Sequence, residues 1–203
     1  MQLRQLSIAN AWELTPIRRE DSRGTFLEWY RFDLLAEVVG HPLDLRQANL
    51  SISRKGVVRG IHYADLPPSQ AKYVTAAHGA VLDYIIDVRV GSPTFGQWDS
   101  VRLDTADNRA VYIAEGLAHA FVALTDDATV TYLVSDVYNP VAEKGINPLD
   151  PRIGLVFPDE AGELSFSEKD EEAPTLEEAE RLGLLPSWSA ALEYYDSINR
   201  SGK

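Results

Sequence analysis

Residues 81–89 of the chain read VLDYIIDVR, and their side chains alternate with a period of two. The even-numbered positions are all apolar or aromatic, whereas the odd-numbered positions include two aspartates and an arginine. This alternation is typical of a β-strand, because successive side chains of a strand point to opposite faces of its sheet. Residues 129–135, TVTYLVS, repeat the pattern around Val130, Tyr132 and Val134. Both stretches therefore predict strands.

Turn-forming sequences separate such stretches at short intervals. They include residues 21–24 (DSRG), 91–93 (GSP), 104–108 (DTADN) and 139–140 (NP). These residue types favour turns because their backbones or side chains adopt turn conformations at low cost. Many short strands joined by closely spaced turns are typical of an antiparallel sandwich or barrel. The sequence thus predicts an all-β fold.

Helical patterns are few and lie mostly near the end of the chain. Residues 32–39 predict one short helix. A second begins at Thr175, which forms a capping box with Glu178, and runs toward Gly183. Residues 194–195, both tyrosines, fall in a third possible helix.

The length and the order of these elements predict one domain over residues 1–203. Residues 1–157 would form the β core, and residues 158–203 a C-terminal segment whose helices pack on it. Residues 159–172 are acidic and polar, and they predict a surface connection between the two parts.

The composition excludes several classes of function. The chain has 45% apolar and 25% charged residues and no cysteine, which excludes disulfides, thiolate metal sites and a cysteine nucleophile. No apolar run reaches the length of a membrane span or a signal peptide, so we expect a cytoplasmic protein without a membrane partner. The net charge of -12 makes nucleic acid an unexpected partner, because nucleic acid needs a broad basic surface.

Four segments carry side chains suited to proton chemistry. His62 lies in RGIHY with Arg59, Lys72 lies in QAKY, His119 ends GLAH, and Tyr132 lies in a predicted strand. A base, two cations and a phenol can remove a proton beside a carbonyl and return one from the other side. A strand histidine alone is more often structural, but Arg59 and Lys72 beside His62 favour catalysis. His41 and His78 lie in turn-like contexts and are expected to be exposed.

Six motifs in this order resemble the dTDP-4-dehydrorhamnose 3,5-epimerase family. They are residues 21–28 (DSRGTFLE), 47–51 (QANLS), 56–63 (GVVRGIHY), 70–74 (QAKYV), 91–98 (GSPTFGQW) and 115–119 (EGLAH). The resemblance covers nearly the whole chain. It implies a cupin-type antiparallel β jelly roll, with a short helical C-terminal tail in this chain. It also implies a homodimer that needs no metal or other cofactor and acts on a dTDP-sugar.

The resemblance also implies roles for individual residues. His62 would be the general base, Tyr132 the general acid, Asp170 the carboxylate paired with the histidine, and Lys72 the cation near the sugar ketone. Substrate-binding roles would fall to Arg23 and Arg59 at the pyrophosphate, His119 in the sugar pocket, Tyr138 against the thymine, and Glu28, Gln47, Asn49, Glu143 and Lys169 elsewhere.

The chain departs from the family pattern at three positions. Tyr63 stands where Phe is more common, Ala120 where Gly is frequent, and Lys169 where Arg is also seen. None of these changes removes a chemical group, so they bear on the exact substrate more than on the reaction.

The implied reaction is epimerisation of a nucleotide-linked 4-keto-6-deoxyhexose. Carbons 3 and 5 both flank the ketone, so loss of either proton gives a stabilised enolate. Histidine suits the base because its unperturbed pKa is near neutral, and a carboxylate would orient it. A cation at the ketone oxygen would stabilise the charge that develops there.

Four alternatives stay open at this level. A single-carbon epimerase and a metal-free keto-sugar isomerase would use the same scaffold. A metal-dependent cupin enzyme would need more ligands than His62 and His119, since Ala64 occupies the position where a second histidine would be expected. A non-catalytic sugar-nucleotide binding module would need neither base nor acid.

Overall fold

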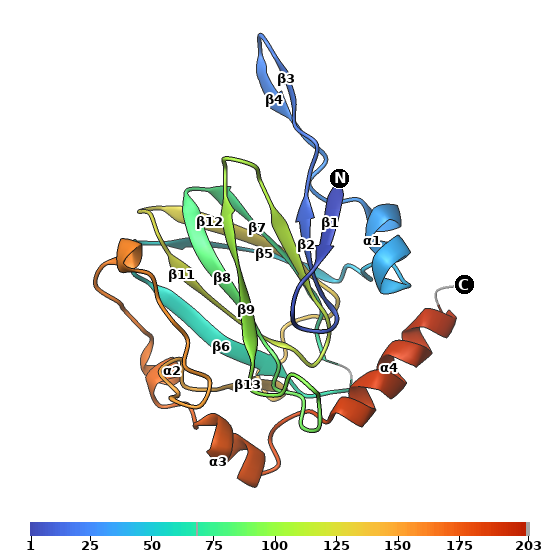
Figure 1. The fold of residues 1–203 in the computed structure, drawn as a ribbon, viewed down its shortest axis with the longest axis vertical. Helices are drawn as coiled ribbons and strands as arrows, with labels where there is room; N and C mark the ends of the chain where they lie inside the picture. Colours follow the sequence, from blue (N-terminus) through green and yellow to red (C-terminus); the bar gives the residue numbers. More distant parts are fainter. Residues whose placement is uncertain (68, 202–203) are drawn as a thin grey trace.

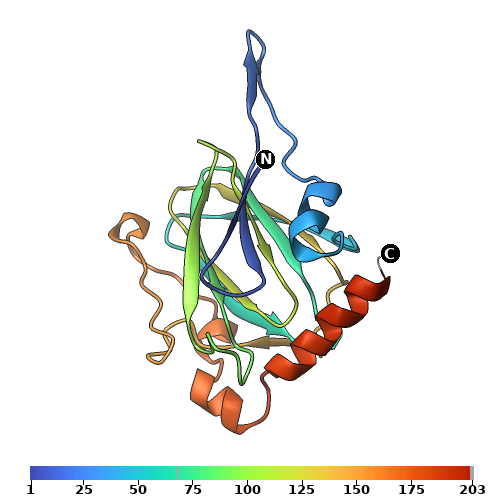
Figure 2. The ribbon, with the colours of Figure 1, turned by 45° about the vertical axis from the view of Figure 1, so that its right-hand side comes forward.

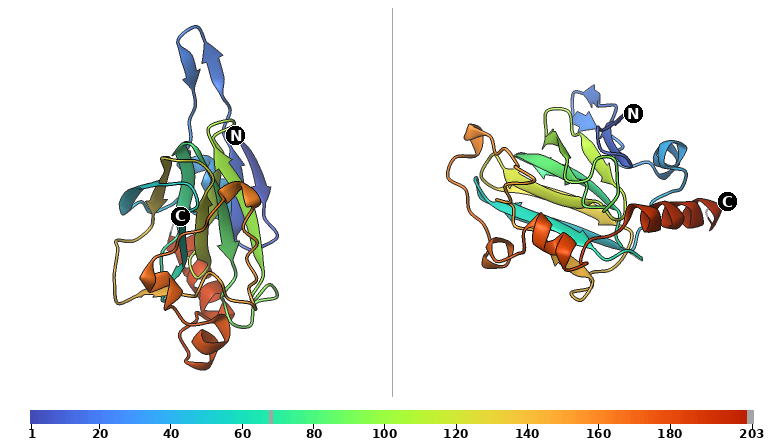
Figure 3. Two further views of the ribbon diagram at one scale, coloured as in Figure 1. Left: turned by 90° about the vertical axis from the view of Figure 1, so that its left-hand side faces the viewer. Right: turned by 60° about the horizontal axis from the view of Figure 1, so that its bottom comes forward.

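A computed structural model describes residues 1–67 and 69–201, and it has two antiparallel sheets that lie face to face (Figures 1 and 3). The six-stranded sheet has the order β1-β2-β10-β7-β12-β5, and the five-stranded sheet has the order β13-β6-β11-β8-β9. The strands of the first are β1 (Gln2–Gln5), β2 (Ala11–Thr15), β5 (Gln47–Ser53), β7 (Lys72–His78), β10 (Ala110–Ile113) and β12 (Ala128–Val134). Those of the second are β6 (Val58–Ala64), β8 (Ala80–Ile86), β9 (Trp98–Asp104), β11 (Ala118–Ala123) and β13 (Glu143–Gly145).

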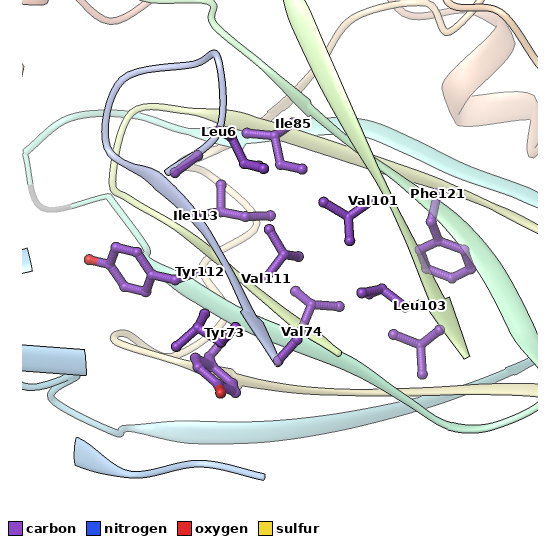
Figure 4. Packing of buried hydrophobic residues seen from close by; sticks show 14 of the residues in the cluster. Leu6, Tyr73, Val74, Ile85, Val101, Leu103, Val111, Tyr112, Ile113 and Phe121 are labelled. Atoms are coloured by element: carbon purple, nitrogen blue, oxygen red, sulfur yellow. The ribbon is translucent and has the colours of Figure 1, made fainter. Parts of the chain in front are cut away.

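The main core lies between the two sheets, where apolar side chains from both interdigitate (Figure 4). Val81 and Ile85 of β8 belong to this core. Tyr84 and Ile86 point the other way, into a second core beneath the C-terminal segment. The predicted alternation in β8 is therefore confirmed, with both faces covered. The prediction of an all-β jelly roll is confirmed as well.

The strand predicted over residues 81–89 ends earlier, at Ile86. Asp87 and Arg89 leave the sheet and form a fully buried ion pair, with Arg89 Nη2 2.7 Å from Asp87 Oδ2. The hydroxyls of Ser92 and Thr94 also donate to Asp87. Ser92 and Thr94 lie in the turn that follows the strand. The chain therefore leaves the sheet after Ile86, where Asp87 can form hydrogen bonds with them.

The predicted helices are present. They are α1 (Phe32–Val39), α3 (Leu176–Arg181) and α4 (Trp188–Ser201), which contains Tyr194 and Tyr195. Thr175 caps α3 in the predicted capping box, since its side chain accepts from Glu178 N while Glu178 Oε2 accepts from Thr175 N. None of the helices in the described part of the chain has the length and apolar character needed to cross a membrane.

Residues 159–172 lie mostly at the surface, as predicted, and they also contain regular structure. They contain the 3₁₀ turn η1 (Asp159–Ala161) and the short helix α2 (Glu168–Glu171), and Ser165 forms backbone hydrogen bonds with Gly56 and Val58. Asp170 is only 5% exposed. Most of the segment is exposed, and several of its side chains also line a cavity. The boundary between residues 157 and 158 stays a prediction.

A two-stranded hairpin, β3 (Arg19–Asp21) and β4 (Gly24–Phe26), extends away from the sandwich at the end opposite α3 (Figures 1 and 2). All six of its strand residues are exposed, including Phe26 at 65%. An isolated two-stranded hairpin is only marginally stable in water.

Candidate active site

A cavity of about 670 Å³ opens beside the two sheets and the segment that precedes α2. It is lined by all but two of the side chains proposed for catalysis and binding: Gln47, Asn49, Arg59, His62, Lys72, His119, Tyr132, Tyr138, Glu143, Lys169 and Asp170. These residues span more than half the chain and come from seven elements and a loop. The fold thus brings them to one place.

A β-bulge aims two of these side chains at the cavity. Residues 59 and 62 would face opposite sides of a regular strand, but the pairing of β6 with β11 shifts register between His62–His119 and Arg59–Phe121. The extra residue lets both Arg59 and His62 line the cavity. Gly60 sits in the bulge with φ of 111°, and a Cβ there would lie 2.5 Å from the His119 carbonyl oxygen. Only glycine fits this close approach.

His62 pairs with Asp170, as the family resemblance implied, at 2.7 Å between Nε2 and Oδ1. Ser167 caps α2, and its hydroxyl accepts from Asp170 N, which holds the backbone of Asp170 at the start of the helix. Burial acts to raise the pKa of Asp170, but His62, the Ser167 side chain and the Gly60 backbone together outweigh it and hold this pKa below its usual range. The carboxylate is therefore charged and orients the ring.

A second histidine in the cavity is also held by a carboxylate. His119 Nε2 lies 2.7 Å from Oδ2 of Asp83, which is completely buried. Burial raises the pKa of Asp83, against the opposing effects of His119 and Lys72. Asp83 therefore holds His119 from the side away from the cavity, since it does not line the cavity itself.

Lys72 and Tyr132 present free polar groups to the cavity. Within the described residues, neither the Lys72 ammonium nor the Tyr132 hydroxyl has a hydrogen-bond partner. Burial lowers the pKa of Lys72, while the carboxylates of Glu143 and Asp83 oppose the shift. Burial also raises the pKa of Tyr132, with a contribution from Glu143 and against Arg59. The phenol therefore keeps its proton at neutral pH.

Polar contacts hold four of the binding candidates in place. Arg59 Nε donates to Ser53 Oγ at 3.1 Å, which leaves the terminal nitrogens of the guanidinium for a ligand. Gln47 Nε2 donates to Asn49 Oδ1 at 2.7 Å, and Gln47 Oε1 accepts from Tyr138 N at 3.0 Å. Gln47 thus links strand β5 to the loop that carries Tyr138.

Two predicted site residues do not line the cavity. Arg23 lies in the turn of the β3–β4 hairpin, where it pairs with Asp21 at 2.6 Å and its side chain is 88% exposed. Glu28 follows the hairpin and pairs with Arg31 at 3.4 Å. Neither residue reaches the cavity of its own chain.

Sequence reasoning missed several cavity-lining residues: Ser51, Val57, Val58, Phe121, Ser165, Phe166 and Ser167. A helix-capping signal was available for Ser167, because an aspartate follows it three positions later. His78 is exposed as predicted, whereas His41 is half-buried and its Nδ1 contacts the Pro42 carbonyl oxygen at 3.0 Å. No group of three or more His, Cys, Asp or Glu among residues 1–67 and 69–201 has the spacing to hold a metal ion.

Comparisons with known proteins fit this geometry. The family model for dTDP-4-dehydrorhamnose 3,5-epimerase matches residues 5–178. The chain is 52% identical over 201 residues to the dTDP-4-dehydrorhamnose 3,5-epimerase of Mycolicibacterium smegmatis, with 99% of this chain and 98% of the relative covered.

Solved structures are similar over nearly the whole chain. The rmlC epimerase of Mycobacterium tuberculosis has a TM-score of 0.95 and 47% identity, and the match covers 98% of this chain and 100% of that one. ChmJ, a 3'-monoepimerase from Streptomyces bikiniensis in complex with dTDP-quinovose, has a TM-score of 0.92 and 47% identity over 96% of this chain and 98% of that one.

Proposed function

The chain belongs to the dTDP-4-dehydrorhamnose 3,5-epimerase family and is an isomerase, and from this premise we propose how its residues act. The substrate is a dTDP-linked 4-keto-6-deoxyhexose, and the reaction removes and returns protons at carbons 3 and 5. The observation that carries the proposal is the convergence of the His62–Asp170 pair, Lys72 and Tyr132 in one cavity.

His62 is the proposed general base. Asp170 accepts from Nε2 of the neutral ring, so the proton-accepting nitrogen is Nδ1. When the imidazole takes a proton from the sugar, the buried carboxylate stabilises the resulting positive charge, which is the function of the aspartate in catalytic triads. The lowered pKa of Asp170 supports this role, since the carboxylate stays charged throughout.

Lys72 is proposed to stabilise the enolate. Negative charge develops on the ketone oxygen as the proton leaves, and a cation aimed at that oxygen lowers the barrier. Lys72 fits this role because it is the lysine on the cavity wall formed by β7, and its ammonium is free of hydrogen bonds to the described residues. Its desolvated surroundings strengthen any charge interaction made there.

Tyr132 is proposed to return the proton from the opposite face of the sugar ring. Inversion requires a donor across the ring from the base, and Tyr132 comes from the six-stranded sheet whereas His62 comes from the five-stranded sheet. The raised pKa of the phenol supports its role as an acid rather than a base.

The nucleotide part of the substrate is proposed to lie toward the rim. Arg59 would bind the diphosphate through charge-assisted hydrogen bonds, with Lys169 nearby, and Tyr138 would stack on the thymine. Gln47, Asn49, His119 and Glu143 would complete the contacts. Binding far from the reacting carbons fixes the orientation of the sugar.

A homodimer is proposed as the working form. The outer face of the six-stranded sheet carries an apolar groove of about 530 Å³, lined in part by Leu27, Trp29, Leu50 and Leu133. Leu50 and Ile52 are 61% and 60% exposed. A second copy that covers this face would bury them and could bring its hairpin, with Arg23 and Glu28, to the cavity. A cytoplasmic location stays a prediction.

Inversion at a single carbon is the second candidate, because ChmJ, at 47% identity, is a 3'-monoepimerase. The decisive experiment is incubation with dTDP-4-keto-6-deoxyglucose in heavy water, followed by NMR. Deuterium at carbons 3 and 5 supports the double epimerase, and label at carbon 3 alone supports the alternative. A bound ligand without any deuterium incorporation would overturn both.

A further inference from the structure

Glu115 is a buried carboxyl group that the proposed mechanism does not use. It lies in the turn between β10 and β11, is 3% exposed, and does not line the cavity. Burying a carboxyl group costs free energy unless its polar atoms are hydrogen-bonded, because burial disfavours the charged form. Its side chain is connected through Ser135 to Ala71, the residue before the cavity-lining Lys72.

A short chain of hydrogen bonds joins Glu115 to the residue before Lys72. The Ser135 hydroxyl donates to Glu115 Oε1 at 3.2 Å and accepts from Ala71 N at 2.8 Å. Ser135 N also donates to the Ala71 carbonyl oxygen at 3.1 Å. Ala71 is therefore held on both sides by Ser135, immediately before Lys72 enters β7. The direction in which the Ser135 hydroxyl points depends on its acceptor, Glu115.

The opposite side of Glu115 is fixed to the C-terminal helix. The Tyr195 hydroxyl of α4 donates to the Glu115 carbonyl oxygen, and Arg89 Nη1 donates to Tyr195 at 3.1 Å. Arg89 is held in turn by its buried ion pair with Asp87. The next residue, Gly116, donates its N–H to Ser69 Oγ at 3.0 Å. The turn is thus hydrogen-bonded on both sides, to α4 and to the segment that leads into Lys72.

The surroundings of Glu115 disfavour a charged carboxylate. Burial raises the pKa of this carboxyl, against smaller opposing effects of its own backbone, His41 and Ser135. Its second oxygen, Oε2, has no hydrogen-bond partner among the described residues. Glutamine would preserve the oxygen that accepts from Ser135 and would carry no charge.

We propose that Glu115 is a positioning residue for epimerisation, which acts through Ser135 and Ala71 to fix the place where Lys72 meets the ketone oxygen. This rests on the proposed function, in which Lys72 stabilises the enolate. Small displacements of a stabilising group are costly, since a shift of about 1 Å can lower a rate 100-fold.

The test compares Glu115→Leu, Glu115→Gln and Ser135→Ala, with Glu37→Leu on the exposed face of α1 as the matched control. We expect Glu115→Leu and Ser135→Ala to lower kcat about 10-fold or more, with KM and dTDP affinity unchanged. Glu115→Gln should restore most of kcat. Because the two residues act in one chain, the double variant should lose no more than either single variant.

A second background shows whether the effect passes through Lys72. In Lys72→Met protein, Glu115→Leu should lower the slow residual deuterium exchange no further. The proposal fails if Glu115→Leu retains wild-type kcat, if KM and dTDP affinity worsen together with kcat, or if the loss persists in full without Lys72. Should Glu115→Leu not fold, Ser135→Ala carries the same comparison. Exchange by the wild-type enzyme tests the proposed function separately.

Discussion

His62 Nε2 lies 2.7 Å from Asp170 Oδ1, although 108 positions separate the two residues in the chain. The contact requires the segment before α2 to run beside β6, where Val58 N donates to the Ser165 carbonyl oxygen at 2.8 Å. The C-terminal segment thus supplies the carboxylate that pairs with the proposed base. A change in Asp170 should therefore affect proton removal and leave the binding of the nucleotide intact.

The first prediction concerns this pair. We expect His62→Ala to abolish deuterium exchange, and Asp170→Asn to lower its rate by about 100-fold or more, because asparagine cannot stabilise the imidazolium. Exchange at carbons 3 and 5 is measured by NMR in heavy water. His78→Ala is the control, since His78 is exposed at the end of β7. Full exchange by His62→Ala would show that the base is a different residue.

The second prediction separates proton removal from proton return. Tyr132→Phe removes the proposed acid and leaves His62 in place, so the inverted product should form about 100-fold more slowly while exchange from the base side is impaired less. Product and exchange are followed in the same NMR experiment. Tyr63→Phe is the matched control, because Tyr63 points into the second core and its hydroxyl donates to the Leu184 carbonyl oxygen. Equal losses in both processes would contradict the assignment.

Local sequence patterns predicted the helices and strands of this fold, whereas such patterns do not reveal the contacts between distant residues that the structure contains. The capping box at Thr175 and the alternation in β8 depend on neighbours within a few residues, so the sequence contained them. The early end of β8 at Ile86 depends on the buried pair of Asp87 and Arg89, which no period of two reveals.

The site shows the same limit. Asp170 lies in an acidic run that by itself predicts a solvated surface, and only the family resemblance singled it out. The bulge at Gly60 is a tertiary feature, and regular alternation would have put Arg59 and His62 on opposite faces. The sequence does not single out Glu115, because its proposed role depends on Ser135 and Tyr195, which lie far from it in the chain.

The third prediction is a pH dependence set by Lys72. Burial lowers the pKa of this ammonium from 10.5, and a base loses its charge as the pH rises through its pKa. Activity that depends on the charged lysine should therefore fall on the alkaline side at a pH below 10.5. The profile of kcat/KM against pH measures this limb. In Lys72→Arg protein the limb should disappear, since arginine stays protonated, and an unmoved limb would assign it to another group.

The fourth prediction tests the bulge. A Cβ at Gly60 would lie 2.5 Å from the His119 carbonyl oxygen and 2.8 Å from Ala120 Cα, so Gly60→Ala should lower the free energy of unfolding by about 3 kcal/mol and displace His62. Gly183→Ala is matched, because Gly183 also has a positive φ but has open space around it, and it should cost about 1 kcal/mol. Urea unfolding and deuterium exchange measure the two effects. Equal stabilities of the two variants would show that the bulge relaxes freely.

The last prediction concerns Arg23, which lies on the hairpin that leaves its own sandwich. If a second copy supplies this arginine, a mixed dimer of His62→Ala and Arg23→Ala subunits has one site with both changes and one site with neither. Purified mixed dimers, isolated with two affinity tags, should then have about half of the wild-type activity although each parent is impaired. If Arg23 served its own chain, every site would carry one change and mixing would restore nothing. In the control mixture, an Arg19→Ala subunit replaces the Arg23→Ala subunit. Arg19 lies on the same hairpin but has no proposed role in substrate binding.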